Sequence, residues 1–190
     1  MRWENHEISA VILAGGKSSR MGQDKAMLPR EGQTQLAYCF NLLAQMQFGE
    51  LKVSGDYPDF PHFVDAEPEL GPLGGLSAAL QQVAPYCKAL LIVPVDMPLL
   101  SSFDIRFLLE GSNEQGGYYQ DALFPVLLGI TPQLRSELKD LLADPSPHKR
   151  SLRSLLKRLN VQVIEPDIDQ QLSLMNANTP EQWQTLLAKQ

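Results

Sequence analysis

Glycines and cations gather in one short segment near the start of the chain. Residues 13–25 read LAGGKSSRMGQDK and contain the pair Gly15-Gly16 and three cations, Lys17, Arg20 and Lys25. Adjacent glycines let the backbone approach an anion closely and direct its N–H groups at it. Arginine adds a fork of donors and lysine a point charge. In a chain of net charge −6, this cluster predicts a site for a polyphosphate.

The spacing of these glycines separates the segment from two common phosphate loops. A P-loop requires GxxxxGK[ST] and a dinucleotide fold requires GxGxxG. Neither pattern occurs between Gly15 and Gly22, which argues against a P-loop ATPase and a Rossmann dehydrogenase. The ordinary alternative is a tight turn after a strand, with solvated lysines.

A carboxylate follows another apolar segment of the chain. Asp96 comes directly after the apolar run 89–95 and shortly before Pro98. Ligands of an open α/β sheet bind beyond the carboxyl ends of its strands, so Asp96 should face the same crevice as the glycine pair. Mg²⁺ prefers one or two carboxylates together with substrate phosphates. We therefore predict Asp96 as a magnesium ligand; its alternative role is to assist the helix that begins near Ser101.

Hydrophobic patterning predicts the elements that position these residues. The apolar runs 8–14 and 89–95 are typical of strands buried on both faces. Shorter strands are expected at 50–54, 62–64, 122–129 and 161–165. Apolar residues at helical spacing predict helices within 36–46, 76–83, 105–109, 134–142 and 180–189. Surface loops are expected at 111–117 and 144–148. The alternation predicts one α/β domain over residues 1–190, with a mainly parallel sheet.

Four segments resemble a known superfamily. Residues 13–29 match LAGGxSxRMGxDKxxLP, the signature of the nucleoside-triphosphate transferases, position by position. GPLGG at 71–75, VPVDMP at 93–98 and NANTPE at 176–181 are similar to a turn, a metal motif and a C-terminal element of that superfamily. Within it, the chain resembles the molybdenum cofactor guanylyltransferases, which join GMP from GTP to molybdopterin. The resemblance implies a three-layer α/β/α Rossmann-like nucleotidyltransferase fold.

The resemblance also implies roles for individual residues. Lys25 and Arg20 would stabilise phosphate charge, and the amides of Gly15 and Gly16 would cradle the triphosphate. Asp96 would hold Mg²⁺, and Asn178 would add a direct or water-mediated contact. The main-chain groups of Leu13, Ala14 and Gly15 would contact guanine.

Two further positions are expected to contact the nucleotide. Asp65 matches an aspartate of the family that contacts GTP, although a lone aspartate after a strand is also a common turn former. Ser54 stands where the family usually has a contacting asparagine. Asn178 has a similar alternative, as a turn residue before the helix at Pro180.

Composition limits the remaining classes of function. With 190 residues, 44% hydrophobic, and more acidic than basic side chains, the chain is too apolar for a disordered protein. It is also too acidic for a general binder of nucleic acid or anionic membranes. The run 89–95 is too short to span a bilayer, and the N-terminus lacks the apolar core of a signal peptide. Cys39 and Cys87 form no metal motif and predict buried thiols. We expect a cytoplasmic protein.

The basic stretch at 149–158 is compatible with more than one role. Its leucines recur at helical spacing, so one face should pack inward. Its cations either form a solvated face or receive the phosphate of molybdopterin or an acidic partner, such as a cofactor-delivery protein or a molybdoenzyme.

The alternatives to GMP transfer are a molybdopterin cytidylyltransferase, a sugar-phosphate nucleotidyltransferase, and a non-catalytic cofactor-delivery adaptor.

Overall fold

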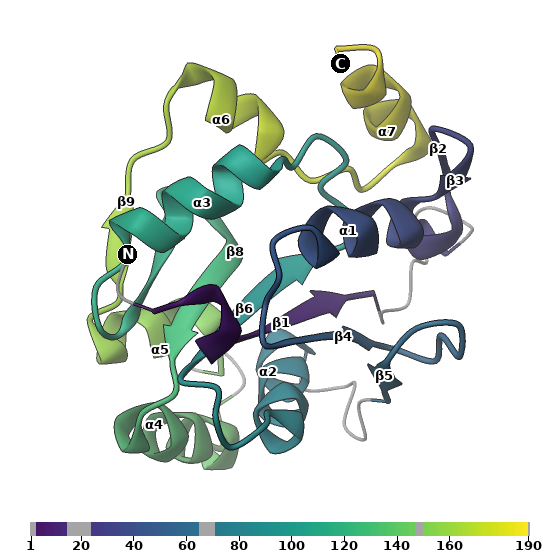
Figure 1. Ribbon diagram of the computed structural model, residues 1–190. Helices are drawn as coiled ribbons and strands as arrows, with labels where there is room; N and C mark the ends of the chain where they lie inside the picture. The colour runs from purple at the N-terminus through teal and green to yellow at the C-terminus, as the bar shows by residue number, and fades with distance from the viewer. Residues whose placement is uncertain (1–2, 15–23, 65–70, 147–149, 190) are drawn as a thin grey trace.

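A seven-stranded sheet forms the centre of the computed structural model, which describes residues 3–14, 24–64, 71–146 and 150–189. The strand order is β5-β4-β1-β6-β8-β7-β9 (Figure 1). The strands are β1 (Ile8–Leu13), β4 (Glu50–Ser54), β5 (His62–Phe63), β6 (Ala89–Pro94), β7 (Gly116–Tyr119), β8 (Ala122–Gly129) and β9 (Gln162–Ile164). A separate hairpin pairs β2 (Pro29–Arg30) with β3 (Gln33–Thr34).

Most neighbouring strands run parallel. β1 pairs in parallel with β4 and β6, β4 pairs so with β5, and β7 with β9. β8 is the exception, since it runs antiparallel to β6 and β7. The predicted mainly parallel sheet is therefore confirmed. The parallel pairing places the carboxyl ends of β4, β1 and β6 at one edge, where ligands of such sheets bind.

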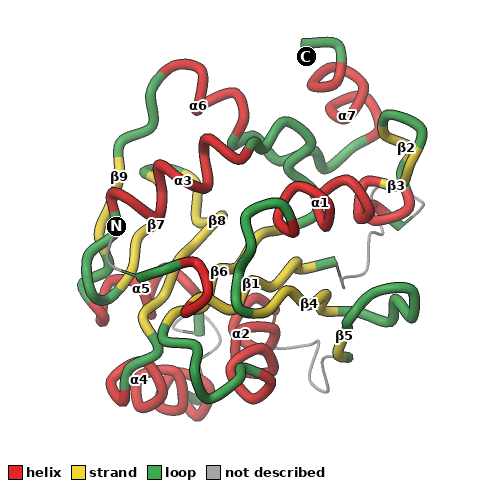
Figure 2. Tube along the Cα trace, in the orientation of Figure 1, coloured by secondary structure: helices red, strands yellow, loops and turns green. Residues whose placement is uncertain are grey.

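Helices cover both faces of the sheet (Figures 1 and 2). One face packs against α1 (Gln35–Ala44) and α3 (Ser102–Gly111), and the other against α2 (Gly71–Gln82), α4 (Pro132–Ala143) and α5 (Leu152–Leu159). Side chains of β1 alternate between the two cores, with Ala10 and Ile12 in one and Val11 in the other. The three-layer α/β/α arrangement is confirmed. The remaining helices are η1 (Asn5–Glu7), η2 (Lys25–Met27), α6 (Ile168–Ser173) and α7 (Pro180–Leu187).

The starts of several helices follow from local sequence. The Ser101 hydroxyl accepts a hydrogen bond from the amide of Asp104, and the Asp104 carboxylate accepts one from the amide of Ser101. This reciprocal cap satisfies N–H groups that a helix start leaves unpaired. At α7 the Thr179 hydroxyl accepts a hydrogen bond from the amide of Gln182, and Pro180 takes the first helical position. Since Asp104 and Ser101 cap α3 themselves, α3 does not need Asp96 for this purpose.

Two glycine-rich segments differ from their predictions. Residues 111–117 were expected to form a loop, but α3 runs to Gly111 and β7 begins at Gly116. A Cβ on Gly116, whose φ is 118°, would lie 1.9 Å from the carbonyl oxygen of Leu127, so glycine here allows close strand contact rather than a loop. GPLGG at 71–75 forms the first turn of α2 instead of a free turn.

A small apolar cluster lies apart from the two cores of the sheet. It consists of Leu28, Ala177, Trp183 and Leu186, which we call the C-terminal cluster, with Leu99 packed against it. These residues come from the segment after η2, from the segment before α7 and from α7 itself, at the upper right of Figure 1. The cluster therefore joins distant parts of the chain near one edge of the sheet.

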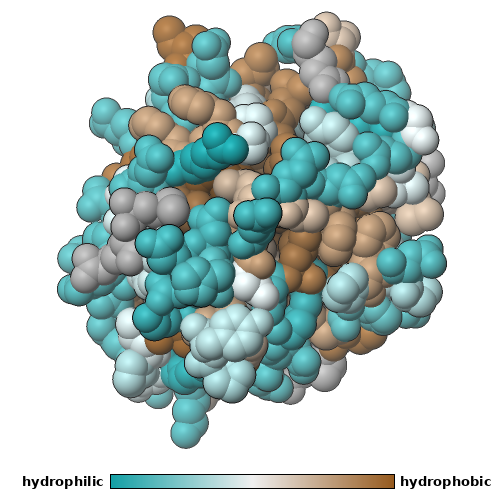
Figure 3. Space-filling model, in the orientation of Figure 1, coloured by the Kyte–Doolittle hydropathy of each residue, from teal (hydrophilic) through white to brown (hydrophobic). Residues whose placement is uncertain are grey.

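The surface is mixed in character. The face seen in Figure 3 is largely hydrophilic, with apolar side chains between. Among the described residues, no helix combines the length and the apolar character that crossing a bilayer requires.

Candidate active site

Lys25, Asp96 and Asn178 come together beyond β6. The ammonium of Lys25 lies 2.9 Å from Oδ2 of Asp96 and 2.8 Å from Oδ1 of Asn178. The side chains of Lys25 and Asp96 are only 13% and 21% exposed, so water screens this ion pair weakly. Three residues that the sequence predicted for phosphate and metal binding thus share one location.

Backbone hydrogen bonds hold each of these residues in place. The amide of Val95 donates to the carbonyl oxygen of Leu13 (3.1 Å), which keeps the segment after β6 paired with β1. The amide of Ala177 donates to the carbonyl oxygen of Asp96 (2.8 Å), which brings Asn178 beside the carboxylate. Lys25 opens η2, and the Asp24 carboxylate caps that helix through the amide of Ala26 (2.9 Å).

The two carboxylate oxygens of Asp96 differ in their contacts. Its Oδ1 is buried and has no hydrogen-bond partner among the described residues, whereas Oδ2 is paired with Lys25. A buried carboxylate oxygen without a partner is costly unless something binds it. Together with the amide oxygen of Asn178, it provides the hard oxygen ligands that suit Mg²⁺, which takes few protein ligands when phosphates supply the rest. Within the described residues no group of three or more His, Cys, Asp or Glu could hold a metal.

Leu13, Ala14 and Ser54 lie side by side at the same sheet edge. Leu13 of β1 is in register with Ser54 of β4, and the amide of Ala14 donates to the carbonyl oxygen of Ser54 (3.2 Å). Ser54 is buried. The sheet therefore already engages the carbonyl of Leu13 and the amide of Ala14, two of the main-chain groups predicted to contact a base.

Four predicted site residues lie outside the described part of the chain. These are Gly15, Gly16, Arg20 and Asp65. Their roles in binding phosphate and nucleotide remain predictions from the sequence.

Tyr57 is a residue that the sequence did not single out. Its hydroxyl lies 2.8 Å from Oδ2 of Asp24 and 3.2 Å from the carbonyl oxygen of Ala14. Burial and the neighbouring Asp24 carboxylate raise the pKa of Tyr57, so the hydroxyl stays protonated and can donate. Tyr57 thus links the described residues on either side of 15–23, a contact for which a lone tyrosine gives no sequence signal.

Gln35 and Cys39 lie behind the segment that carries Asp96. Gln35 is fully buried, and its Nε2 donates to the carbonyl oxygen of Val95 (3.1 Å) and lies 3.2 Å from Sγ of Cys39. Burial raises the pKa of the Cys39 thiol to about 12. At neutral pH this thiol is protonated, and since only a thiolate is a good nucleophile, Cys39 is a packing residue. Cys87 is likewise buried and free.

A cavity of about 580 Å³ adjoins the site. Its lining includes Met97, which follows Asp96 in the sequence, and Asn176, which lies two positions before Asn178. Its remaining lining residues are Gln120, Asp121, Ala122, Leu123, Phe124, Arg153, Pro166, Gln171, Leu174 and Met175. Arg153 comes from the basic stretch on α5, whereas Arg158 pairs instead with Glu137 on α4 (3.2 Å). The structure therefore brings one cation of that stretch to the cavity.

Comparison with known proteins adds to this geometry. Residues 10–163 match the family model described as a MobA-like NTP transferase domain. A relative from Xanthomonas euvesicatoria pv. vesicatoria, named molybdenum cofactor guanylyltransferase, is 38% identical over 179 residues, 94% of each chain. A relative of the same name from Shewanella frigidimarina is 32% identical over 196 residues, 95% of each chain.

A solved structure shows the same fold. Molybdopterin-guanine dinucleotide biosynthesis protein A from Archaeoglobus fulgidus superposes with a TM-score of 0.68 at 16% identity. The superposition covers 96% of this chain and 100% of that one. At this identity the likeness establishes the arrangement of the sheet and helices alone.

Proposed function

The chain belongs to the MobA-like NTP transferase family and is a nucleotidyltransferase, and from this premise we propose that it transfers GMP from GTP to molybdopterin with release of pyrophosphate. The observation that carries the proposal is the ammonium of Lys25 held between the oxygens of Asp96 and Asn178, beside a cavity. The names of the relatives from Xanthomonas and Shewanella support the choice of reaction. In this proposal residues 1–190 act as one nucleotidyltransferase domain.

The reaction needs no nucleophile from the protein. The terminal phosphate of molybdopterin, already ionised, attacks the α-phosphorus of GTP; a new P–O bond forms, and the bond to pyrophosphate breaks. Catalysis then consists of positioning and charge stabilisation. Lys25 balances negative charge on the phosphates, and Arg20 acts with it. The amides of Gly15 and Gly16 bind the triphosphate.

Magnesium fits the oxygens on this edge of the sheet. Asp96 would hold it through its carboxylate, whose Oδ1 is buried and has no hydrogen-bond partner among the described residues, and Asn178 would add its amide oxygen. When bound, Mg²⁺ neutralises phosphate charge. The main-chain groups of Leu13, Ala14 and Gly15 would contact the guanine, and Ser54 and Asp65 would add further contacts with the nucleotide.

The cavity beside Met97 accommodates the pterin of the acceptor. Its wall includes Phe124, a flat apolar surface, and the amide side chains of Gln120, Gln171 and Asn176, which can donate to and accept from a heterocycle. Ligand pockets commonly combine an apolar lining with a few polar groups in this way. Arg153 supplies a positive charge at the same wall. The other cations of the basic stretch on α5 would contact a cofactor-delivery protein or a molybdoenzyme in the cytoplasm.

Substitution of Asp96 tests the assignment. Asp96→Ala should abolish pyrophosphate release from GTP in the presence of Mg²⁺ and molybdopterin, because the metal loses its carboxylate, while circular dichroism stays native. Asp140→Ala, on the exposed face of α4, is the matched control and should retain full activity. Normal magnesium-dependent turnover in Asp96→Ala would refute the assignment.

Ligand specificity is tested separately. GTP with Mg²⁺ should raise the melting temperature more than CTP with Mg²⁺ does. A larger shift with CTP would instead indicate a cytidylyltransferase. If no nucleoside triphosphate yields pyrophosphate with molybdopterin, the proposed transfer to molybdopterin is wrong.

A further inference from the structure

Arg30 is a buried arginine outside the site residues described so far. Its side chain is 2% exposed, and Nη1 donates to the carbonyl oxygen of Pro98. Its Cζ lies 3.8 Å from the centre of the Tyr38 ring. Nη2 is 3.7 Å from the Glu31 carboxylate, and Nε is buried with no hydrogen-bond partner in the described part of the chain.

Burying the Arg30 guanidinium costs free energy, so its presence in the interior requires a structural or functional reason. A guanidinium loses its hydration on burial, and one backbone acceptor, one ring face and a long ion pair replace that hydration only in part. An apolar side chain of similar volume would fill the same space without this loss. The contact with Pro98 is therefore the feature to explain.

The position of Arg30 in the chain provides the explanation. Arg30 follows Lys25 in the segment formed by η2 and β2, and Pro98 follows Asp96 in the segment after β6. The guanidinium therefore connects the two segments that carry the ion pair. Tyr38 on α1 supports the flat face of the guanidinium, as the pairing of arginine with aromatic rings allows.

The third segment of the site joins the same assembly through other contacts. Ala177 donates its amide to the carbonyl oxygen of Asp96, and its side chain packs with Leu28 in the C-terminal cluster. Asn178 is thereby fixed relative to both other segments. Arg30 adds a link between the Lys25 and Asp96 segments, because its side chain donates to the carbonyl oxygen of Pro98.

We propose that Arg30 is a positioning residue, which sets the separation of the Lys25 ammonium and the Asp96 carboxylate by holding the backbone at Pro98. The inference rests on the magnesium-dependent transfer proposed above. Arg30 touches neither substrate nor metal in this role. It acts through the geometry of Asp96, where small displacements of reacting groups are costly.

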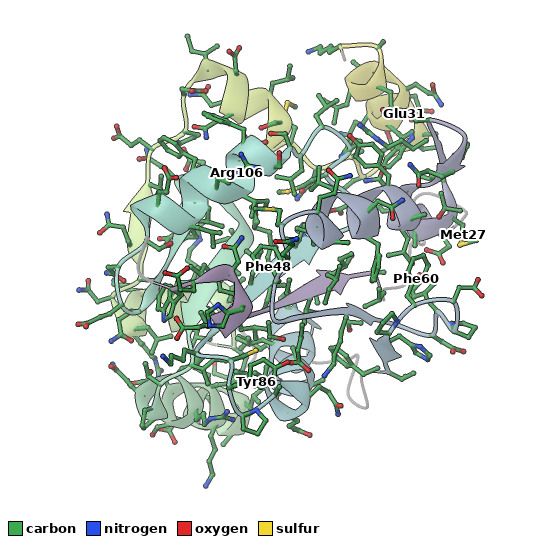
Figure 4. The ribbon with its side chains drawn as sticks, in the orientation of Figure 1. Met27, Glu31, Phe48, Phe60, Tyr86 and Arg106 are labelled. Atoms are coloured by element: carbon green, nitrogen blue, oxygen red, sulfur yellow. The ribbon has the colours of Figure 1, made fainter. Side chains whose placement is uncertain are left out.

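The kinetic test compares Arg30→Met, Arg30→Lys and Arg106→Met. Arg30→Met keeps much of the volume but loses the donor, and Arg30→Lys keeps one donor and the charge. Arg106, exposed on α3 (Figure 4), provides the matched control. In Arg30→Met, kcat should fall by about 10²-fold and the Mg²⁺ concentration for half-maximal rate should rise, with KM for GTP unchanged. Arg30→Lys should restore part of both losses, and Arg106→Met should match the parent.

A second readout does not depend on turnover. Binding of Mn²⁺ with GTP, followed by electron paramagnetic resonance, should weaken in Arg30→Met and recover partly in Arg30→Lys. Tyr38→Leu should weaken binding in the same direction, whereas Tyr38→Phe, which keeps the ring, should not. If Arg30→Met does not fold, Arg30→Lys and Tyr38→Leu decide the question.

The outcomes separate the two proposals. If the parent protein releases no pyrophosphate from any nucleotide, the proposed function fails, while the Mn²⁺ measurements still decide the role of Arg30. Unchanged Mn²⁺ affinity and Mg²⁺ dependence in the Arg30 variants would overturn the positioning role. So would rates that fall only in proportion to the folded fraction measured by circular dichroism.

Discussion

Lys25 contacts both oxygen-bearing partners in the site, so its removal affects more than one interaction. Lys25→Met should lower kcat for pyrophosphate release by about 10²- to 10³-fold, since one positioned donor to developing charge is worth that much. Combining it with Asn178→Ala, which removes the other partner of the Lys25 ammonium, should add little, because residues that act as a unit are not additive. Steady-state kinetics of the two single variants and the double variant check this. Fully multiplicative losses would contradict a shared role.

Tyr57 offers a second test among single residues. Tyr57→Phe removes the hydroxyl that contacts Asp24 and Ala14, which should cost about 0.5–1.5 kcal/mol of unfolding free energy and raise KM for GTP. Tyr86→Phe is the matched control, since its hydroxyl donates to the carbonyl oxygen of Gly49 (3.0 Å), on another part of the surface (Figure 4). Urea unfolding and kinetics compare the two. Equal effects on KM would argue against a role for Tyr57 at the nucleotide.

Sequence information about single residues was uneven. Charge and position after a strand were enough to predict Lys25 and Asp96, the resemblance added Asn178, and the structure brings these three together. Arg30 and Tyr57 escaped prediction because each contacts backbone groups of a distant segment, and no local pattern marks such contacts. Whether the predicted residues bind nucleotide and metal stays a prediction.

Among the elements, β4 is tied to its surroundings through a carboxylate. Burial of Glu50 opposes its ionisation, but the Lys52 ammonium (2.9 Å), the amide of Ala84 (2.8 Å) and the Ser9 hydroxyl (3.2 Å) outweigh it. The pKa of Glu50 is therefore lowered from its ordinary value of 4.5. A lowered folded-state pKa adds stability above pH 4.5 that is lost as the pH falls through the folded-state value.

Glu50→Gln tests this linkage. The variant should be less stable than the parent at neutral pH, and the difference should shrink as the pH drops below 4.5. Urea unfolding at a series of pH values measures it. A difference that stays constant down to pH 3 would show that Glu50 contributes through its shape and not through its charge.

Elements with strong patterns were predicted well. The runs 8–14 and 89–95 correspond to β1 and β6, and the segment 122–129 to β8. β7 was missed because its glycines are typical of loops, while here they permit close strand contact. Two other elements were missed because they are short: the hairpin of β2 and β3, and α6. Neither is long enough for its apolar residues to show a regular spacing.

For the molecule as a whole, the C-terminal cluster connects stability with the site. Trp183→Ala should cost about 3–5 kcal/mol where the cavity cannot collapse and should lower activity more than it lowers sheet content, because α7 loses its anchor. Amide hydrogen exchange should show protection lost in 176–189 while β1 and β6 stay protected. Loss of protection throughout the sheet would mean that the cluster and the main cores unfold together.

The global arrangement followed from sequence in part. Strand and helix alternation predicted the mainly parallel sheet, and the family resemblance added the three layers. It did not predict that β8 reverses direction, because an apolar strand buried on both faces has the same composition in either orientation. The resemblance alone implied that Asn178 belongs to the site, and its contact with Lys25 was not predicted.

The hydrogen bond between Lys25 and Asn178 joins residues 153 positions apart. Closing so long a loop is entropically unfavourable until the intervening chain is ordered. A refolding molecule can thus regain its full helical spectrum before it regains any turnover. The recovery of pyrophosphate release is then the measurement that reports the last step of refolding. A circular dichroism signal alone overstates the fraction of active protein.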